Sequence, residues 1–175
     1  MANPNPIPDA ALTQHTIVRP FGPAPAIIVP TDMDKAYAAG FFDGEGNVCI
    51  ASNKSGGHDR SRLVYNMRLG ASQCNPEPLY WLLDRWGGSF RQNHYGNGAG
   101  VSDGYIWQCF SLGAAAFLRD VLPYLQVKRK RAELALRFQA TTFQPGRRAH
   151  TPAWNVERAA MKAEMNRLNR PGVTA

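Results

Sequence analysis

The sequence predicts an α+β fold in which a helix is followed by two strands, a second helix, two more strands and further helices. Two observations predict this αββαββα order. Segments with alternating apolar and polar residues occur in pairs, and each pair follows a segment with helical periodicity. Glycine-rich turns then separate the segments. We expect the four strands to form one antiparallel sheet with a polar face.

The first helix is predicted within residues 31–47. Thr31 and Asp34 have the spacing of a capping box, with a carboxylate at the positive end of the helix dipole. Small residues at i, i+3 and i+4 spacing form one stripe that would let two helix backbones approach closely: Ala36, Ala39 and Gly40. The helix should end at residues 43–46, and strand alternation begins with Val48 and Ile50.

Strands are predicted near residues 47–53, 62–72, 89–93 and 105–110. The second strand shows the clearest alternation, with Leu63, Tyr65, Met67 and Leu69 against Arg62, Val64, Asn66 and Arg68. This period predicts one buried face and one exposed, basic face. A helix should start at Asn75-Pro76, with Leu79, Leu82, Leu83 and Trp86 as its apolar side, and end at Gly87-Gly88.

Three helices are predicted after the strands, near residues 112–121, 127–141 and 151–168. The last should carry Trp154, Met161, Met165 and Leu168 on its apolar side, and Arg158, Lys162 and Arg167 elsewhere. Residues 1–30 contain seven of the thirteen prolines and are expected to form an extended arm. The predicted organisation is therefore an arm at 1–30, a core at 31–150, and a C-terminal amphipathic helix and tail at 151–175.

The composition favours a polyanionic partner. The chain of 175 residues has a formal net charge of +7 and a pI near 9.7, which indicates nucleic acid before membrane. The three cysteines, Cys49, Cys74 and Cys109, are isolated and favour neither a zinc site nor a disulfide framework. No apolar run is long enough to span a bilayer, and the N-terminus lacks a basic signal-peptide start. We expect a soluble, intracellular protein of unknown compartment.

Three segments resemble the LAGLIDADG homing endonucleases of the single-motif type. Residues 38–46 (AAGFFDGEG) resemble the family's signature motif, with Ala38 and Glu45 as its variant positions. Residues 67–73 (MRLGASQ) are similar to the end of the family's second strand, and residues 123–132 (PYLQVKRKRA) to the segment that carries its active-site lysine. The resemblance spans about residues 32–142 and implies the LAGLIDADG fold, with a saddle-shaped antiparallel sheet.

The resemblance also implies site residues. Glu45 and the Gly44 carbonyl would hold Mg²⁺, with Mn²⁺ as an alternative, while Gln73 would orient water and Lys128 would stabilise charge. Phosphodiester hydrolysis requires such residue types, because metals held by carboxylates neutralise the transition state and activate water. Asp43 is expected to cap and fix the helix interface. Some relatives have an arginine at the position of Glu77, so the basic residues around the site should differ here.

Without the resemblance, each pattern has a simpler interpretation. Residues 43–46 are also typical of a buried helix that ends in a glycine-rich turn with solvated acids. The four basic residues at 128–131 are also typical of a solvated face or of phosphate contacts. The glycines do not indicate a dinucleotide site, because a helix and not a strand precedes them.

The polar sheet face is predicted to read DNA in the major groove, with basic residues of 128–148, including Arg147 and Arg148, on phosphates. The predicted DNA-binding residues are Asn53, Asn66, Arg68, Arg91, Asn93, Gln108, Arg129 and Lys130. A single motif implies a homodimer with a pseudo-palindromic target, whose interface residues would be Ala36, Ala39, Gly40 and Asp43. The expected activity is a metal-dependent, site-specific double-strand break. An RNA maturase and a non-cleaving DNA-binding regulator remain the alternatives.

Overall fold

The computed structural model describes residues 28–54, 63–95, 102–142 and 152–170. In chain order its elements are α2 (Asp32–Glu45), β1 (Gly46–Lys54), β2 (Leu63–Gln73), α3 (Glu77–Trp86), β3 (Ser89–Tyr95), β4 (Ser102–Phe110), α4 (Ser111–Val121), α5 (Arg129–Thr142) and α6 (Pro152–Leu168). This order confirms the predicted αββαββα arrangement and the α+β class.

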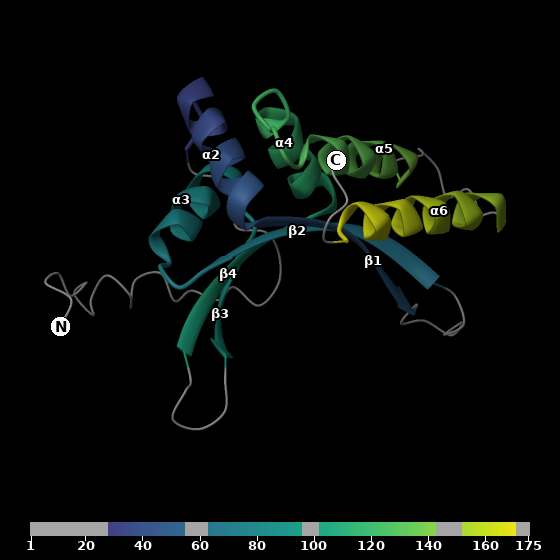
Figure 1. Ribbon diagram of the computed structural model, residues 1–175, viewed down its shortest axis with the longest axis horizontal. Helices are drawn as coiled ribbons and strands as arrows, with labels where there is room; N and C mark the ends of the chain where they lie inside the picture. Colours follow the sequence, from purple (N-terminus) through teal and green to yellow (C-terminus); the bar gives the residue numbers. More distant parts are fainter. Residues whose placement is uncertain (1–27, 55–62, 96–101, 143–151, 171–175) are drawn as a thin grey trace, which may run out of the picture.

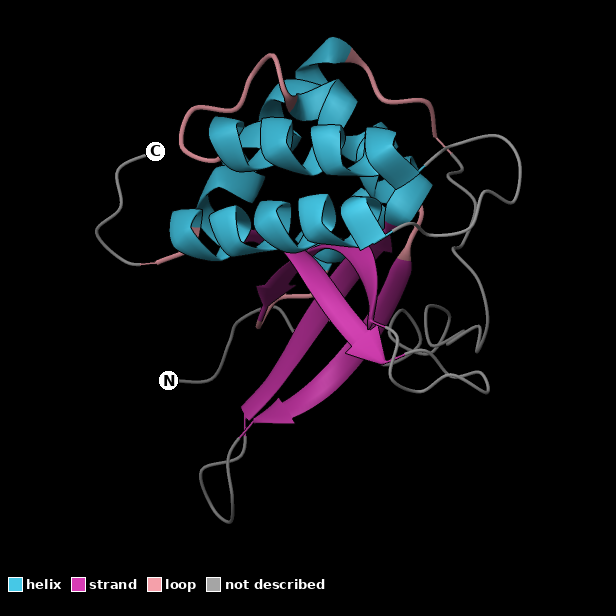
Figure 2. Ribbon diagram, turned by 90° about the vertical axis from the view of Figure 1, so that its right-hand side faces the viewer, coloured by secondary structure: helices cyan, strands magenta, loops and turns pink. Residues whose placement is uncertain are grey.

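The four strands form one antiparallel sheet in the order β1-β2-β4-β3. Figure 1 shows the helices on one side of a strongly curved sheet, with α6 lying along β1. The turned view in Figure 2 shows the same two layers, with the helices above and the opposite face of the strands uncovered. In the described part of the chain, the sheet therefore has one covered face and one open face.

The start of α2 is a capping box, as predicted. The Asp34 amide donates to Thr31 Oγ1 over 3.2 Å, and the Asp34 carboxylate accepts from the Thr31 amide over 2.9 Å. The hydrogen bonds with Thr31 lower the pKa of Asp34, and Arg85 contributes to the same shift. Arg85 Nε lies 3.0 Å from the Asp34 carboxylate, so the salt bridge ties α3 to the start of α2.

The glycine pair after α3 has the conformations that only glycine adopts readily. Gly87 and Gly88 have φ values of 65° and 105°, and a Cβ at Gly88 would lie 2.5 Å from the Gln108 carbonyl oxygen. The predicted helix end is confirmed. The helix starts at Glu77, directly after Pro76. Asn75 Oδ1 accepts a hydrogen bond from the Glu77 amide over 3.1 Å.

An aromatic cluster fills the space between the helices and the covered face. The Phe117 ring on α4 meets the rings of Phe42, Trp86 and Trp107 edge to face, with centroids 5.0, 5.2 and 5.1 Å apart. Trp107 on β4 is completely buried and donates to the Gly87 carbonyl oxygen over 2.8 Å. The end of α2, α3, α4 and the middle of the sheet thus share one core.

Helix α6 packs on β1 and α5, but one predicted feature of it was wrong. Arg158 was expected outside the apolar side, whereas it is only 1% exposed. Its guanidinium lies between the rings of Phe138 and Trp154, 4.1 and 4.2 Å from their centroids, and donates to the Tyr65 carbonyl oxygen over 2.9 Å. Burial lowers the pKa of Arg158 to about 10. The flat guanidinium stacks on aromatic faces, which allows a cation on the buried side.

The three cysteines lie in different environments: Cys109 is buried, Cys49 is partly buried and Cys74 is exposed. All three cysteines are free, and burial raises the pKa of the Cys109 thiol to about 12. No helix within the described ranges is long and apolar enough to cross a membrane. Of the predicted arm, only residues 28–30 are described, where the Ile28 amide donates to the Asp84 carbonyl oxygen over 3.0 Å. The predicted division into arm, core and C-terminal segment stays a prediction.

Candidate functional site

The junction between α2 and β1 presents the carboxylate that the sequence singled out. Glu45 is the last residue of α2, and the Gly46 amide closes the helix on the Phe42 carbonyl oxygen. A Cβ at Gly46 would lie only 2.3 Å from the Phe42 ring, so the chain can pass from helix to strand over this ring only with glycine there. Glu45 is exposed and makes no hydrogen bond or salt bridge with another described residue.

Asp43, two residues before Glu45, forms hydrogen bonds within its own chain. Its carboxylate accepts from three consecutive amides, those of Gln126, Val127 and Lys128, over 2.7, 3.1 and 2.8 Å. This explains why α5 begins at Arg129 and not at residue 127 as predicted, because the preceding amides turn towards Asp43. The expected capping role agrees with this geometry, while the assignment of Asp43 to a dimer interface stays a prediction.

Lys128 reaches the same helix end from the segment between α4 and α5. It is 9% exposed, and its Nζ donates to the Asp43 carbonyl oxygen. This carbonyl belongs to the negative end of the α2 dipole, which favours a cation. Burial lowers the pKa of Lys128, and the charges of Asp43 and Glu45 oppose that shift. The fold therefore places an ammonium group next to the turn that carries Glu45.

Gln73 ends β2 at the same edge of the site. Gly46 pairs with Ala71, so the residues that follow Ala71 lie beside the end of α2. By strand alternation Gln73 leaves β2 on the covered side, like the buried Ala71. Ser72 lines the open groove together with Glu45. Sequence reasoning missed Ser72, although the alternation through Met67 and Leu69 already placed it on the exposed side; the role of Gln73 stays a prediction.

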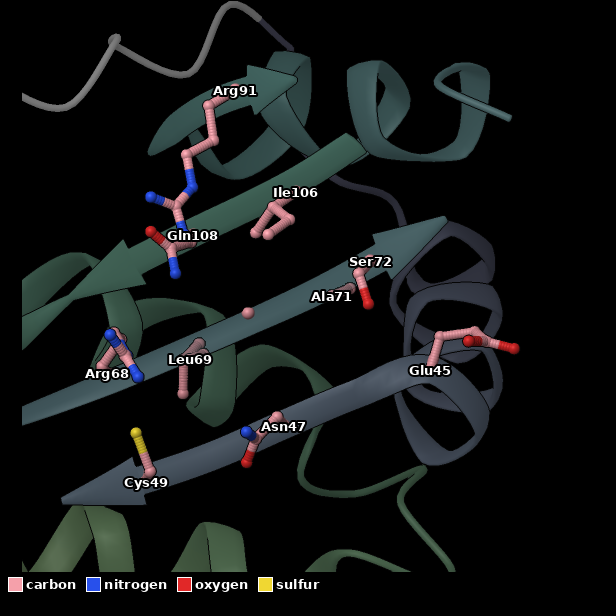
Figure 3. A pocket seen from close by; sticks show the side chains of 11 residues that line it. Glu45, Asn47, Cys49, Arg68, Leu69, Ala71, Ser72, Arg91, Ile106 and Gln108 are labelled. Atoms are coloured by element: carbon pink, nitrogen blue, oxygen red, sulfur yellow. The ribbon is translucent and has the colours of Figure 1, made fainter. Parts of the chain in front are cut away.

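A groove of about 240 Å³ lies on the open face of the sheet, with Glu45 at one end. Three of the predicted DNA-binding residues line it: Arg68, Arg91 and Gln108. Figure 3 shows their side chains on the same face as Asn47 and Cys49. Asn66 lies between the buried Tyr65 and Met67, so it belongs to this face of β2. Asn53 is exposed and has the same alternation on β1 as Asn47 and Cys49, which places it on this face further along the strand. The Asn93 side chain and residues 147 and 148 lie outside what the structure describes.

Two predicted DNA-binding residues lie in the helical layer instead. Arg129 donates to the carbonyl oxygens of Leu125 and Pro123 over 3.2 and 3.0 Å. Lys130 lines a separate cavity between α5 and α6 that also contains Glu133 and Glu164. Neither side chain belongs to the groove on the open face, and contacts of these residues with DNA stay a prediction.

The predicted stripe of small residues on α2 needs one correction. Ala39 is completely buried in the core of its own chain and cannot contribute to an exposed stripe. The exposed side of α2 consists of Met33, Ala36, Tyr37, Gly40 and Gly44. A Cβ on Gly40 or Gly44 would meet no atom within 4 Å, so this side of the helix is open. The prediction failed for Ala39 because a helix has 3.6 residues per turn, so the positions three and four residues after Ala36 lie close to the same face, and spacing does not tell which of them is buried.

The carboxylates that the structure describes do not form a complete metal site by themselves. Within the described residues, no group of three or more His, Cys, Asp or Glu side chains could hold a metal ion. Glu77, where some relatives have an arginine, is the exposed first residue of α3. Glu45 and the last carbonyl groups of α2 remain as oxygen donors, since the final turn of a helix leaves its carbonyls without helical partners.

Solved structures with the same architecture are homing endonucleases. I-CvuI, solved in complex with the I-CreI target in 2 mM Mg with the DNA not cleaved, has a TM-score of 0.62 at 18% identity, covering 82% of this chain and 86% of that one. The archaeal intron-encoded I-Vdi141I, complexed with DNA, has a TM-score of 0.63 at 14% identity, covering 81% and 87%. The LAGLIDADG homing endonuclease I-GzeII, in complex with its DNA target, has a TM-score of 0.60 at 15% identity, covering 75% and 44%.

A second I-CvuI complex, with the target Sro1.3 in 2 mM Ca, has a TM-score of 0.61 at 19% identity and covers 82% of this chain and 87% of that one. No family model and no curated protein matches the sequence. The similarity to these structures therefore lies in the three-dimensional arrangement of the chain. This chain has the fold of the LAGLIDADG homing endonucleases.

Proposed function

We propose that this protein is a homodimeric, site-specific DNA endonuclease that uses a divalent metal ion and makes a double-strand break. The observation that carries the proposal is the exposed Glu45 carboxylate, which has no partner among the described residues, at one end of the open groove, with the Lys128 ammonium near the same helix end. A carboxylate beside a polyanion is unfavourable unless a cation joins them, and a metal-dependent nuclease provides that cation.

The open face suits the major groove of a DNA duplex. It is a curved sheet face with free arginine and amide side chains, and the chain carries a net charge of +7. Arg68, Arg91 and Gln108 are of the types that pair with guanine and adenine edges in the major groove. Homing endonucleases with this fold were solved in complex with DNA, which supports the same partner here.

The second subunit would complete the site. A single described chain offers one carboxylate at this end of the groove, and the exposed side of α2 offers small residues for close helix packing. Ala36, Gly40 and Gly44 are spaced four residues apart, which would let the α2 backbones of two copies approach. A two-fold axis along this contact would bring two Glu45 residues together and require a pseudo-palindromic target.

The donor set fits Mg²⁺ or Mn²⁺, because Glu45 and the Gly44 carbonyl are oxygen ligands and such ions keep several positions for phosphate and water. When bound, the metal supplies Lewis-acid stabilisation of the phosphate and a more acidic water. Lys128 would stabilise negative charge near the scissile phosphate, and Gln73 would orient water. Asp43 would hold Lys128 in place through the three amides before α5.

Glu45→Gln tests the chemistry. It removes the charge but keeps the shape, so DNA cleavage should fall by about 10³-fold or more while binding in Ca²⁺ changes little. Cleaved sequences would first be selected from a randomised duplex library with Mg²⁺, and single-turnover rates then measured on the selected site. Glu133→Gln, an exposed carboxylate in the helical layer, is the matched control.

Sedimentation velocity of the wild-type protein accompanies these assays. Cleavage by a stable monomer would exclude the homodimer, and undiminished cleavage by Glu45→Gln would place the metal ligand elsewhere. Sequence-specific binding without any cleavage by the wild type would instead indicate a DNA-binding regulator. Binding confined to structured RNA would indicate a maturase.

A further inference from the structure

The two arginines of the groove, Arg68 and Arg91, each lie beside apolar or weakly polar side chains on the neighbouring strands. Arg68 on β2 pairs with Cys49 on β1 at one side and with Phe110 on β4 at the other. Phe110 is 49% exposed, although its neighbour Cys109 is buried, so it lies on the open face by alternation. Arg68 is therefore flanked on both sides by an apolar or weakly polar side chain.

Arg91 on β3 repeats the arrangement. It pairs with Ile106 on β4, and both residues line the groove. Figure 3 shows Ile106 on the same face as Arg91, and Cys49 with its sulfur directed towards the strand that carries Arg68. An isoleucine on an open sheet face contributes nothing to the core of its own chain. Each guanidinium in the groove thus has an apolar cross-strand neighbour.

Both guanidinium groups are available for a ligand. Neither Arg68 nor Arg91 forms a hydrogen bond or salt bridge with another residue that the structure describes, in contrast to Arg85 and Arg131. In the major groove an arginine matches guanine N7 and O6 with two hydrogen bonds, whereas an apolar side chain contacts the C5 methyl group of a pyrimidine. Side chains of directly paired residues start about 5 Å apart, and neighbouring bases are stacked about 3.4 Å apart, so two paired side chains can reach adjacent bases.

We propose that the open face selects guanines that stand next to a C5-methylated pyrimidine, thymine or 5-methylcytosine. Arg68 and Arg91 each read one guanine. Cys49 and Phe110, which lie on opposite sides of Arg68, each contact a methyl group beside the first guanine, and Ile106 contacts the methyl group beside the second. This inference rests on the proposed docking of the sheet in the major groove and adds the chemistry of the base step that it recognises.

The register also sets the distance between the two steps. Ile106 and Phe110, the partners of Arg91 and Arg68, are separated by four positions on β4. At 3.3 Å per residue they lie about 13 Å apart along the strand, which corresponds to about four base pairs. Each half-site of a bound sequence should therefore contain two such steps at about this spacing.

The experiment is a binding selection from a randomised duplex library in Ca²⁺, followed by base analogues in the selected sequence. Uracil in place of the thymine beside each guanine removes only the methyl group and should weaken binding about fourfold per contact. Cytosine at that position should bind equally weakly, and 5-methylcytosine should restore binding. Uracil at thymines away from these guanines is the matched control and should have no effect.

Variants assign the contacts. Ile106→Ala should abolish the uracil penalty beside one guanine and leave the other, and Cys49→Ala combined with Phe110→Ala should do the reverse. Far-ultraviolet circular dichroism checks that each variant is folded. The proposal is overturned if uracil is tolerated beside both guanines, or if the penalties persist in these variants. A selected sequence that is bound but not cleaved in Mg²⁺ contradicts the nuclease function alone, while absence of any sequence preference contradicts the base reading itself.

Discussion

The two faces of the sheet contain arginines in opposite situations. On the open face Arg68 is exposed and forms no hydrogen bond or salt bridge with another described residue. On the covered side Arg158 is 1% exposed, lies between two aromatic rings and donates to the Tyr65 carbonyl oxygen. Arginine therefore stabilises the fold on the covered side, at Arg158, and remains available to a partner on the open side, at Arg68.

The difference between the faces follows from what packs against each. The helices cover one face with aromatic side chains, so a cation there must stack and donate in order to offset its desolvation. Two nitrogens of Arg158, Nε and Nη1, have no hydrogen-bond partner within the part of the chain that the structure describes. The open face is exposed to solvent, so an arginine there stays hydrated and has no desolvation penalty. A residue type thus indicates function only after its environment is known.

Truncation of Arg158 should have the largest effect on stability. Arg158→Ala removes the packing between Phe138 and Trp154 and leaves the Tyr65 carbonyl without its donor, so the free energy of unfolding should fall by about 3 kcal/mol. Arg158→Met keeps the volume and removes the buried charge, and should cost about 1 kcal/mol. Urea unfolding at fixed protein concentration measures both. Equal losses for the two variants would show that the packing between the rings is not what matters.

Truncation of Arg68 should leave stability unchanged and alter recognition. Arg68→Ala should lose about 1 to 3 kcal/mol of discrimination at a symmetric pair of base positions, because a bidentate contact to guanine is removed. The measurement is a binding profile over all single-base variants of the selected site. Uniform weakening on every variant would instead mean that Arg68 contacts phosphate, since phosphate contacts carry no sequence information.

Ser52 and Asn53 are adjacent in sequence but lie on opposite faces of β1, so variants of the two compare the covered and open faces at neighbouring positions. Ser52 accepts from Lys162 Nζ of α6, whereas Asn53 is exposed on the open side. Ser52→Ala should cost about 1 kcal/mol of stability without changing base preference. Asn53→Ala should change base preference with a stability loss under about 0.5 kcal/mol. If the two variants exchange these effects, the register of β1 is assigned to the wrong face.

Much of the local structure could be predicted because it depends on residues close together in the chain. The alternation from Leu63 to Leu69 predicted the buried side of β2, and the structure buries Tyr65, Met67 and Leu69. Leu63, at the start of the strand, was predicted on the same side but is 44% exposed. The Thr31 capping box and the Gly87-Gly88 helix end are formed by a few consecutive residues, and both occur as predicted. The change between helical and strand periodicity also predicted the order of helices and strands along the chain, which the structure confirms.

The failures involve contacts between distant segments. The start of α5 shifted to Arg129 because the carboxylate of Asp43 binds the amides before it, which no local pattern encodes. Ala39 was placed on an exposed stripe because periodicity cannot tell which side of a helix its own chain covers. Arg158 was placed outside the apolar side of α6 because its charge was read without the aromatic rings that receive it.

The sequence by itself determined the element order, the two faces of β2, the start of α2, the end of α3 and the position of Glu45 at the exit of α2, since each depends on spacing within one segment. Only the tertiary structure decided that Lys128 meets the end of α2, that Ser72 shares the groove with Glu45, and that Arg68 and Arg91 have apolar neighbours across the sheet. Those arrangements depend on the register between strands and on the packing of helices from distant parts of the chain, where the contact energies of many residues act together.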